Sequence, residues 1–144
     1  MTGLIREQYL AVIQDEWGAY VECFQALSPQ AQAAFLAKQG YTRLADLLAH
    51  IIAWWEMGQR AIPALLSNPA FHEQDYDVDA FNARAVERFS ELDESTVLQA
   101  FKAQHAAMTD LVAHLPAAAF QDQRILDRLH IEFVGHLREH ELPH

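Results

Sequence analysis

The sequence predicts an all-α fold, specifically a four-helix bundle, from three observations. Apolar residues recur at three- and four-residue steps along most of the chain, which is the spacing of one face of an α-helix. Only 5 Gly and 5 Pro occur among the 144 residues, so turns are few and the helices must be long. No segment alternates apolar and polar residues as a strand does. Since no linker or internal repeat divides the chain, residues 1–144 are expected to form one domain.

The first long helix is expected from Leu4 to Leu27. A short helix follows it, because Ser28 is a favoured N-cap residue and Pro29 suits the first helical position. This short helix is expected to run to about Ala37 and to end at Gly40. The apolar stripe of the first helix consists of Tyr9, Val12, Ile13, Trp17, Tyr20, Phe24 and Leu27.

The second long helix is expected to begin after Thr42 as its N-cap and to end at about Leu66. Pro63 should kink or loosen its last turn, because proline cannot donate the backbone hydrogen bond of a helix interior. Residues 67–78 contain Asn-Pro and several acids, and are expected to form a loop. The apolar stripe consists of Leu44, Leu47, Leu48, Ile51, Trp54, Trp55, Gly58 and Ile62.

The third helical region is expected to begin at Asp79 as its N-cap, to break near Ser90 and to be capped again by Asp93. Pro116 should end it, since proline cannot continue a helix. After a short connection, the final helix is expected from about Arg124 to Leu142. Four long amphipathic helices in one small domain must bury their apolar stripes against one another, which is the arrangement of a four-helix bundle.

The loop at 67–78 indicates how the four helices are connected. Its 12 residues, at about 3.3 Å each, can span roughly 40 Å. The second helix, with about 25 residues at 1.5 Å each, is roughly 37 Å long. The loop can therefore cross the whole bundle, and an up-down-down-up topology is expected with a long crossover between the second and third helices. In that topology the second helix begins at the end where the fourth helix finishes.

The charge and cysteine content exclude several classes of function. With 20 acidic and 10 basic residues the formal net charge is −10, which disfavours binding to nucleic acid and to anionic membranes. The N-terminus has no apolar core run, so no signal peptide is expected, and residues 44–55 are too short to span a bilayer. A cytoplasmic location is expected. Cys23 is the only cysteine, and it is interpreted as a small buried hydrophobe rather than a catalytic thiol.

Three histidines form a candidate metal site. His136 and His140 are an H-x-x-x-H pair, so both imidazoles project from one face of a helix. His50 lies on or beside the apolar stripe of the second helix, and the up-down-down-up topology would bring it to the same end of the bundle. Three neutral imidazoles would leave a position open on a divalent ion, as in catalytic zinc sites.

Ordinary explanations of the same residues remain open. With 8 His in 144 residues, chance alone yields about 0.4 H-x-x-x-H pairs. A histidine pair near a helix C-terminus is also favoured by the helix dipole, and His50 could be a core histidine. Glu132, one turn before His136, is interpreted as solvated rather than as a group supporting the site. His144 is interpreted as part of a frayed tail, and the other histidines are expected to lie away from the site, namely His72, His105, His114 and His130.

Four segments resemble a known family. TRLADLLAHIIAWWE at 42–56 and HLREH at 136–140 resemble the DinB/YfiT-like superfamily of metal-dependent bundle proteins. DVDAFNARAV at 77–86 and LVAHLP at 111–116 are similar to its ClbS/DfsB branch. The resemblance covers nearly the whole chain and keeps the order of the segments.

The resemblance implies an up-down-down-up bundle that binds a divalent ion, Zn or Ni, at His50, His136 and His140, and that often forms homodimers. Members of the superfamily include thiol-dependent S-transferases and isomerases as well as metal-dependent hydrolases. The ClbS branch includes a hydrolase that opens a reactive cyclopropane in a genotoxin.

Together the residues and the resemblance lead us to expect a metal-dependent enzyme acting on a small molecule, by hydrolysis or by transfer of a low-molecular-weight thiol. The alternatives are a non-catalytic protein that binds or sequesters a small molecule, and a dimeric interaction module without a metal.

Overall fold

The computed structural model describes residues 5–73 and 75–143. Within these residues the chain forms six helices and no strand, so the all-α prediction is confirmed. The first and the last helix are each interrupted by a π-helical segment. The first comprises α1 (Arg6–Ala11), η1 (Val12–Trp17) and α2 (Gly18–Gln25), and the last comprises α7 (Gln123–Leu129), η3 (His130–Gly135) and α8 (His136–Glu139).

The short helix α3 (Pro29–Gln39) forms as its terminal residues predict. The hydroxyl oxygen of Ser28 accepts a hydrogen bond from the backbone N–H of Ala31 at 3.1 Å, and Pro29 occupies the first turn. Gly40 follows with φ 86°, a left-handed conformation that glycine adopts without a steric penalty. This glycine turns the chain directly into the approach to the next helix.

The long helix α4 (Leu44–Ser67) begins later than predicted. Arg43, not Thr42, occupies the N-cap position, with φ −125° and ψ 147°, and no side chain caps this end by a hydrogen bond. The guanidinium of Arg43 instead contacts Asp46 at 2.8 Å, in the first turn. Pro63 lies inside the helix, which continues to Ser67.

The third helical region consists of two helices, α5 (Val78–Phe89) and α6 (Glu94–His114). The prediction that Asp79 caps the first of them is wrong, because it is Asp77 whose carboxylate accepts from the N–H of Ala80 at 3.1 Å. Both aspartates have residues with helical spacing after them, and only the structure distinguishes them. The predicted cap at Asp93 is confirmed, since its carboxylate accepts from the N–H of Thr96 at 2.8 Å.

A short 3₁₀-helix, η2 (Ala117–Gln121), occupies the connection before the last helix. The carboxylate of Asp122 then caps α7, accepting from the N–H of Arg124 at 3.0 Å. The predicted end of the last helix at Leu142 is wrong. The helix ends at Glu139, and His140 follows it with φ −113° and ψ 25°, outside the helical region.

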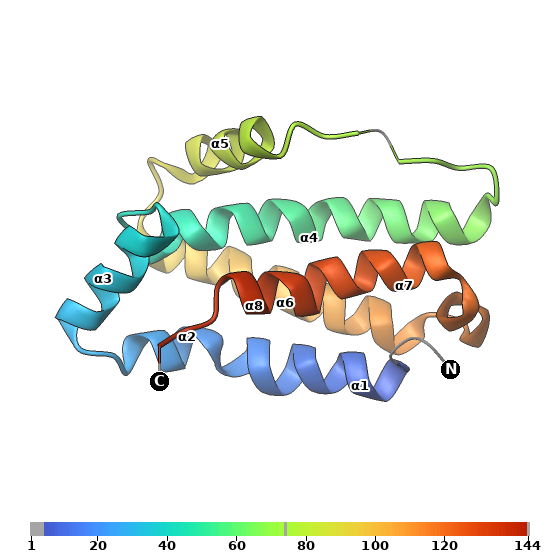
Figure 1. The fold of residues 1–144 in the computed structure, drawn as a ribbon, viewed down its shortest axis with the longest axis horizontal. Coiled ribbons are helices and arrows are strands. Elements are labelled where there is room, and N and C mark those ends of the chain that lie inside the picture. The colour runs from blue at the N-terminus through green and yellow to red at the C-terminus, as the bar shows by residue number, and fades with distance from the viewer. Residues whose placement is uncertain (1–4, 74, 144) are drawn as a thin grey trace.

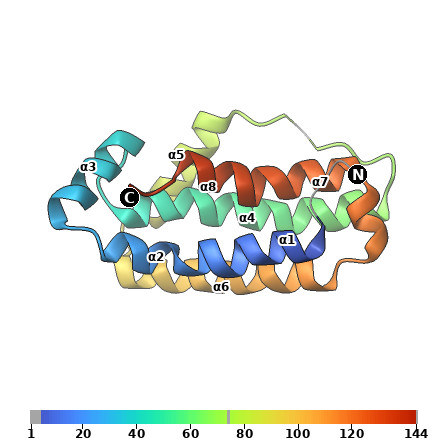
Figure 2. The same ribbon diagram turned by 60° about the horizontal axis from the view of Figure 1, so that its bottom comes forward.

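Figure 1 shows how the helices are arranged. The first helix and the last helix run from right to left, whereas α4 and α6 run from left to right. The segment after α4 runs back along that helix to α5, so α6 starts near the beginning of α4. In Figure 2 the first helix lies alongside α6 and the last helix alongside α4, and the contacts of α1 with α6 and of α4 with α7 agree.

The apolar stripes meet in one core. Trp17 and Trp55 are 1 % and 0 % exposed, and their rings pack edge to face at 5.2 Å. Phe101 of α6 and Phe133 of the last helix pack against the same Trp55 ring, at 5.4 Å and 5.8 Å. Among the residues described, no helix is both long enough and apolar enough to cross a bilayer.

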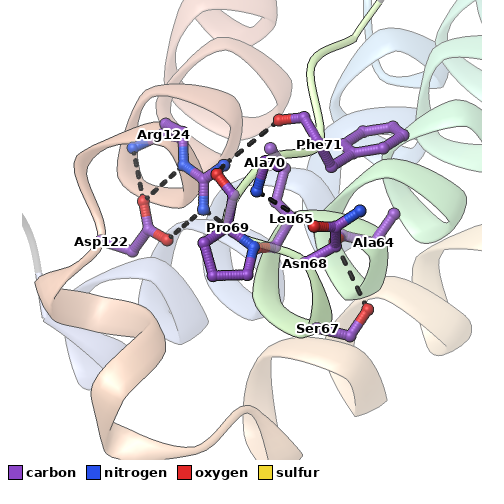
Figure 3. A network of polar contacts seen from close by, with 9 residues as sticks. All are labelled: Ala64, Leu65, Ser67, Asn68, Pro69, Ala70, Phe71, Asp122 and Arg124. Atoms are coloured by element: carbon purple, nitrogen blue, oxygen red, sulfur yellow. Dashed lines mark hydrogen bonds and ion pairs between the residues drawn. The ribbon is translucent and has the colours of Figure 1, made fainter.

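One arginine holds the segment after α4 against the last helix (Figure 3). The guanidinium of Arg124 donates to the carbonyl oxygen of Leu65 at 3.0 Å and to those of Pro69 and Phe71, both at 3.2 Å. Asp122 holds the same guanidinium from the other side, at 2.9 Å. Arg124 thus satisfies the carbonyl of Leu65 in the last turn of α4, which has no partner within the helix, and two carbonyls of the segment that follows.

We expect Arg124→Met to loosen this segment without unfolding the core. Because three backbone carbonyls lose their donor, amide hydrogen exchange at Asn68, Ala70 and Phe71 should accelerate by about tenfold or more, while exchange in the core of α4 stays slow. Arg138→Met, which removes an exposed arginine elsewhere, is the control. Equal exchange in both variants would show that Arg124 does not hold the segment.

Candidate metal centre

The three candidate ligands come from two helices and lie together. His50 is in α4, His136 is the first residue of α8, and His140 follows the end of α8. The ring centroids of His50 and His140 are 4.6 Å apart, those of His50 and His136 5.9 Å, and those of His136 and His140 6.2 Å. All three side chains are buried, with 3 %, 8 % and 7 % of the residue exposed. The structure therefore brings the three residues together, whereas metal binding stays a prediction.

Each ring is held through Nδ1 by a different partner. Nδ1–H of His140 donates to the amide oxygen of Gln39 at 2.7 Å, and Nδ1–H of His136 donates to the backbone carbonyl of Glu132 at 3.2 Å. Nδ1 of His50 lies 3.2 Å from the hydroxyl of Tyr41. This pattern leaves Nε2 of each ring for the cluster. Metal-binding histidines are commonly oriented in this way through their second ring nitrogen.

Burial keeps all three imidazoles neutral. Desolvation lowers the pKa of His50 to about 3, with further lowering by His140 and His136. Desolvation also lowers the pKa of His136 and of His140, each to about 4, and His136 adds to the lowering at His140. Neutral imidazole is the form that binds a metal ion, so the rings need lose no proton at neutral pH.

The local backbone explains how His136 is oriented. The π-helical segment η3 precedes it directly, and such segments often occur at functional sites. Within η3 the carbonyl oxygen of Glu132 accepts from both the His136 ring and Nε1–H of Trp55, each at 3.2 Å. The next carbonyl, that of Phe133, accepts from Nε1–H of Trp17 at 2.9 Å. Two buried indoles thus fix the segment that carries His136.

The end of the last helix is fixed by the first helix and by α3. The hydroxyl of Tyr20 donates to the backbone carbonyl of His140 at 2.6 Å, and burial raises the pKa of that hydroxyl. Because Gly40 ends α3, Gln39 and Tyr41 lie on either side of the turn and contact His140 and His50 respectively.

Glu132 corrects the sequence interpretation. It was expected to be solvated, but it is 0 % exposed, and neither carboxyl oxygen has a hydrogen-bond partner among the described residues. Desolvation raises its pKa to about 8, although the Arg128 guanidinium, with 3.7 Å between Nη2 and Oε1, acts in the opposite direction. The effect of burial on the pKa outweighs that of this one positive charge, because 3.7 Å between the two groups is too long for a hydrogen bond. A Cβ atom at Gly58 would lie 3.1 Å from Oε2, so the glycine leaves room for the carboxyl group.

The remaining histidines lie elsewhere, as expected. His72 is exposed in the segment after α4, and His114 and His130 are exposed on their helices. His105 of α6 contacts the carbonyl oxygen of Ile13 through Nε2 at 2.7 Å. His144 lies outside the described residues. Cys23, expected to be buried, is exposed, since its position on the first helix faces away from the core.

The spacing of the rings is that of hydrogen-bonded side chains. In the described part of the chain, no three His, Cys, Asp or Glu side chains are spaced as ligands around an ion. Nε2 of His50 and Nε2 of His140 are 2.9 Å apart, whereas two nitrogens bound to one tetrahedral zinc at about 2.0–2.1 Å lie about 3.4 Å apart. An ion would therefore require the two rings to separate by about half an ångström. The donor set itself, three neutral imidazoles with their other nitrogens held, fits a borderline divalent ion.

Comparison of the chain with protein-family models, with curated proteins and with solved structures gives no match.

Sequence reasoning did not find Gln39 or Tyr41. Neither has a diagnostic spacing to the histidine that it contacts, because Gln39 lies 101 positions from His140, and Tyr41 precedes the helix of His50. The positive-φ glycine between them is the one local signal, and it predicts a turn without showing what the turn approaches.

Proposed function

We propose that this protein is a metal-dependent enzyme that acts on a small molecule, with a divalent ion, zinc or nickel, held by His50, His136 and His140. The observation that carries the proposal is the convergence of three buried, neutral imidazoles, each held through Nδ1 by a separate partner. When bound, such an ion supplies Lewis-acid chemistry, lowering the pKa of a nucleophile and polarising an electrophile. The nucleophile is water in hydrolysis or a low-molecular-weight thiol in transfer.

The chain's own residues would orient and shield the reaction. Tyr41 and Gln39 fix the rings of His50 and His140, and the burial of all three histidines limits access of bulk water. A groove of about 910 Å³ between the first and last helices offers a place for the substrate, with Tyr20 and Leu137 in its wall. None of the three histidines lines this groove, and its link to the centre is Tyr20, whose hydroxyl donates to the backbone carbonyl of His140.

The topology of the bundle, its family and its oligomeric state are part of the same proposal. The chain would be an up-down-down-up bundle of the DinB/YfiT-like kind, near the ClbS/DfsB branch and dimeric. The directions of the helices in Figure 1 support the topology, as does the extended segment that connects α4 to α5. The topology matters to the site because it places the beginning of α4 beside the end of α8.

A non-catalytic binding protein is the second candidate, favoured by the near-complete burial of the three rings. Turnover separates the two. Protein loaded with zinc or nickel should hydrolyse 4-nitrophenyl acetate, or should accelerate the reaction of cysteine or glutathione with 1-chloro-2,4-dinitrobenzene. The activity should disappear on chelation and in folded His136→Ala. Stoichiometric metal without any such turnover would favour the binding protein.

A further inference from the structure

Two neighbouring grooves lie between α4 and the segments that follow it, and neither is lined by any of the three histidines. The first, of about 400 Å³, lies between α4 and residues 71–73 and 76, and its apolar wall includes Met57, Phe71 and Tyr76. The second, of about 390 Å³, lies between α4 and α5 and is lined by Phe81, Arg84 and Arg88. Arg60 lines both grooves, so they meet at its side chain.

Aromatic rings form the junction between the grooves. Tyr76 of the first groove and Phe81 of the second pack at 6.0 Å, and both contact the ring of Trp54, at 5.8 Å and 4.1 Å. The Trp54 indole is itself held by a hydrogen bond of 2.7 Å from Nε1 to the amide oxygen of Asn82. The Tyr76 and Phe81 rings meet at 67°, so they form an aromatic corner against which a face and an edge of a flat apolar group can pack.

The charges of the two grooves leave a positive excess. The carboxylates that line them are Glu56 and Glu73, and each is already paired. Glu56 binds Arg88 in a bidentate arrangement at 2.6 Å and 3.1 Å, and Glu73 binds the buried Arg128 at 2.8 Å.

Arg60 and Arg84 remain without a counter-ion. Neither forms an ion pair among the described residues, and Nη2 of Arg60 contacts only the sulfur of Met57, at 3.7 Å. Both side chains are exposed at the rim of the second groove, where their guanidinium groups are free to bind an anionic ligand. Guanidinium groups bind carboxylates in a bidentate manner and stack on aromatic rings.

We propose that these joined grooves bind a small aromatic carboxylate, with its ring on the Tyr76–Phe81 surface and its carboxylate between Arg60 and Arg84. The site is separate from the histidine cluster and does not depend on a metal ion. The joined grooves bind ligands that combine a flat apolar body with one negative charge.

The test uses 2-naphthoate as the probe and uncharged 2-naphthamide as its matched control. Calorimetric titration of the full chain should show saturable binding of 2-naphthoate. The amide 2-naphthamide should bind at least about tenfold more weakly, because it has no negative charge to pair with the two guanidinium groups. In NMR spectra, 2-naphthoate should shift the side-chain N–H signals of Arg60 and Arg84. Arg60→Gln and Arg84→Gln should each weaken binding about tenfold.

Lys102→Gln removes the same charge from an exposed position outside both grooves and should leave the affinity unchanged. Raising the salt concentration should weaken the binding of 2-naphthoate but not that of the amide. Equal affinities for the two probes would overturn the proposal. So would equal losses in Lys102→Gln and Arg84→Gln, or NMR shifts confined to His50, His136 and His140.

Discussion

Replacing His140 with alanine is expected to lower the zinc affinity of the protein by more than about 100-fold. The loss of a residue that only orients a ligand lowers the affinity by about 10–100-fold. The variant removes one of the three proposed ligands, and it also leaves the amide of Gln39 without the ring that it contacts at 2.7 Å. Competition with a chromophoric chelator measures the affinity. Circular dichroism of the variant shows whether the helices are retained.

The exposed His114 provides the matched control. It has 76 % of its side chain exposed and lies on α6, away from the cluster, so His114→Ala should bind zinc like the wild type. Gln39→Ala should fall between the two, with a loss of about 10–100-fold, because the ligand remains but loses its orientation. If His140→Ala and His114→Ala had the same zinc affinity, His140 would not be a ligand.

Glu132 is expected to make the stability of metal-stripped protein fall as the pH rises. Burial raises its pKa from the ordinary 4.5 to about 8, so the folded chain retains a proton that the unfolded chain releases between these values. The stabilisation is fully present below about pH 4.5 and is lost toward pH 8, at up to about 1.4 kcal/mol per pH unit. Urea unfolding should show Glu132→Gln gaining about 3 kcal/mol relative to the wild type between pH 5 and pH 8.

The three histidines act in the opposite direction and at lower pH. Their folded pKa values lie below the ordinary 6.5, so their contribution is present above pH 6.5 and is lost as the pH falls toward 4. This contribution cancels when the wild type is compared with Glu132→Gln, because both proteins contain the three histidines. The exposed Glu87 supplies the control, and Glu87→Gln should follow the wild type. Parallel pH profiles for wild type and Glu132→Gln would mean that the buried carboxyl is charged in the folded protein.

The helices could be predicted because their signals are local. The apolar stripe from Tyr9 to Phe24 follows from steps of three and four residues, and the Ser28–Pro29 start and the Asp93 cap follow from residues within about one turn of one another. The two errors have different causes. Asp77 and Asp79 are equally good caps by residue type, whereas the carbonyl of His140, just beyond the end of the last helix, is bound by Tyr20, which is far away in sequence.

The candidate site could be predicted only in part. The i, i+4 pair His136/His140 is visible in the sequence, and His50 joins it because α4 begins where the last helix ends. Gln39, Tyr41 and the buried Glu132 could not be found, since their contacts are made between helices. Glu132 was the hardest, because its burial depends on Gly58 of α4 leaving space opposite it.

X-ray absorption at the zinc edge of the zinc-loaded protein tests the central claim most directly. The proposal predicts one zinc per chain with three imidazole nitrogens at about 2.0–2.1 Å, and weaker imidazole scattering per zinc in His50→Ala. A zinc coordination shell that contains sulfur, a coordination shell of oxygen alone, or the absence of stoichiometric zinc would contradict the proposal.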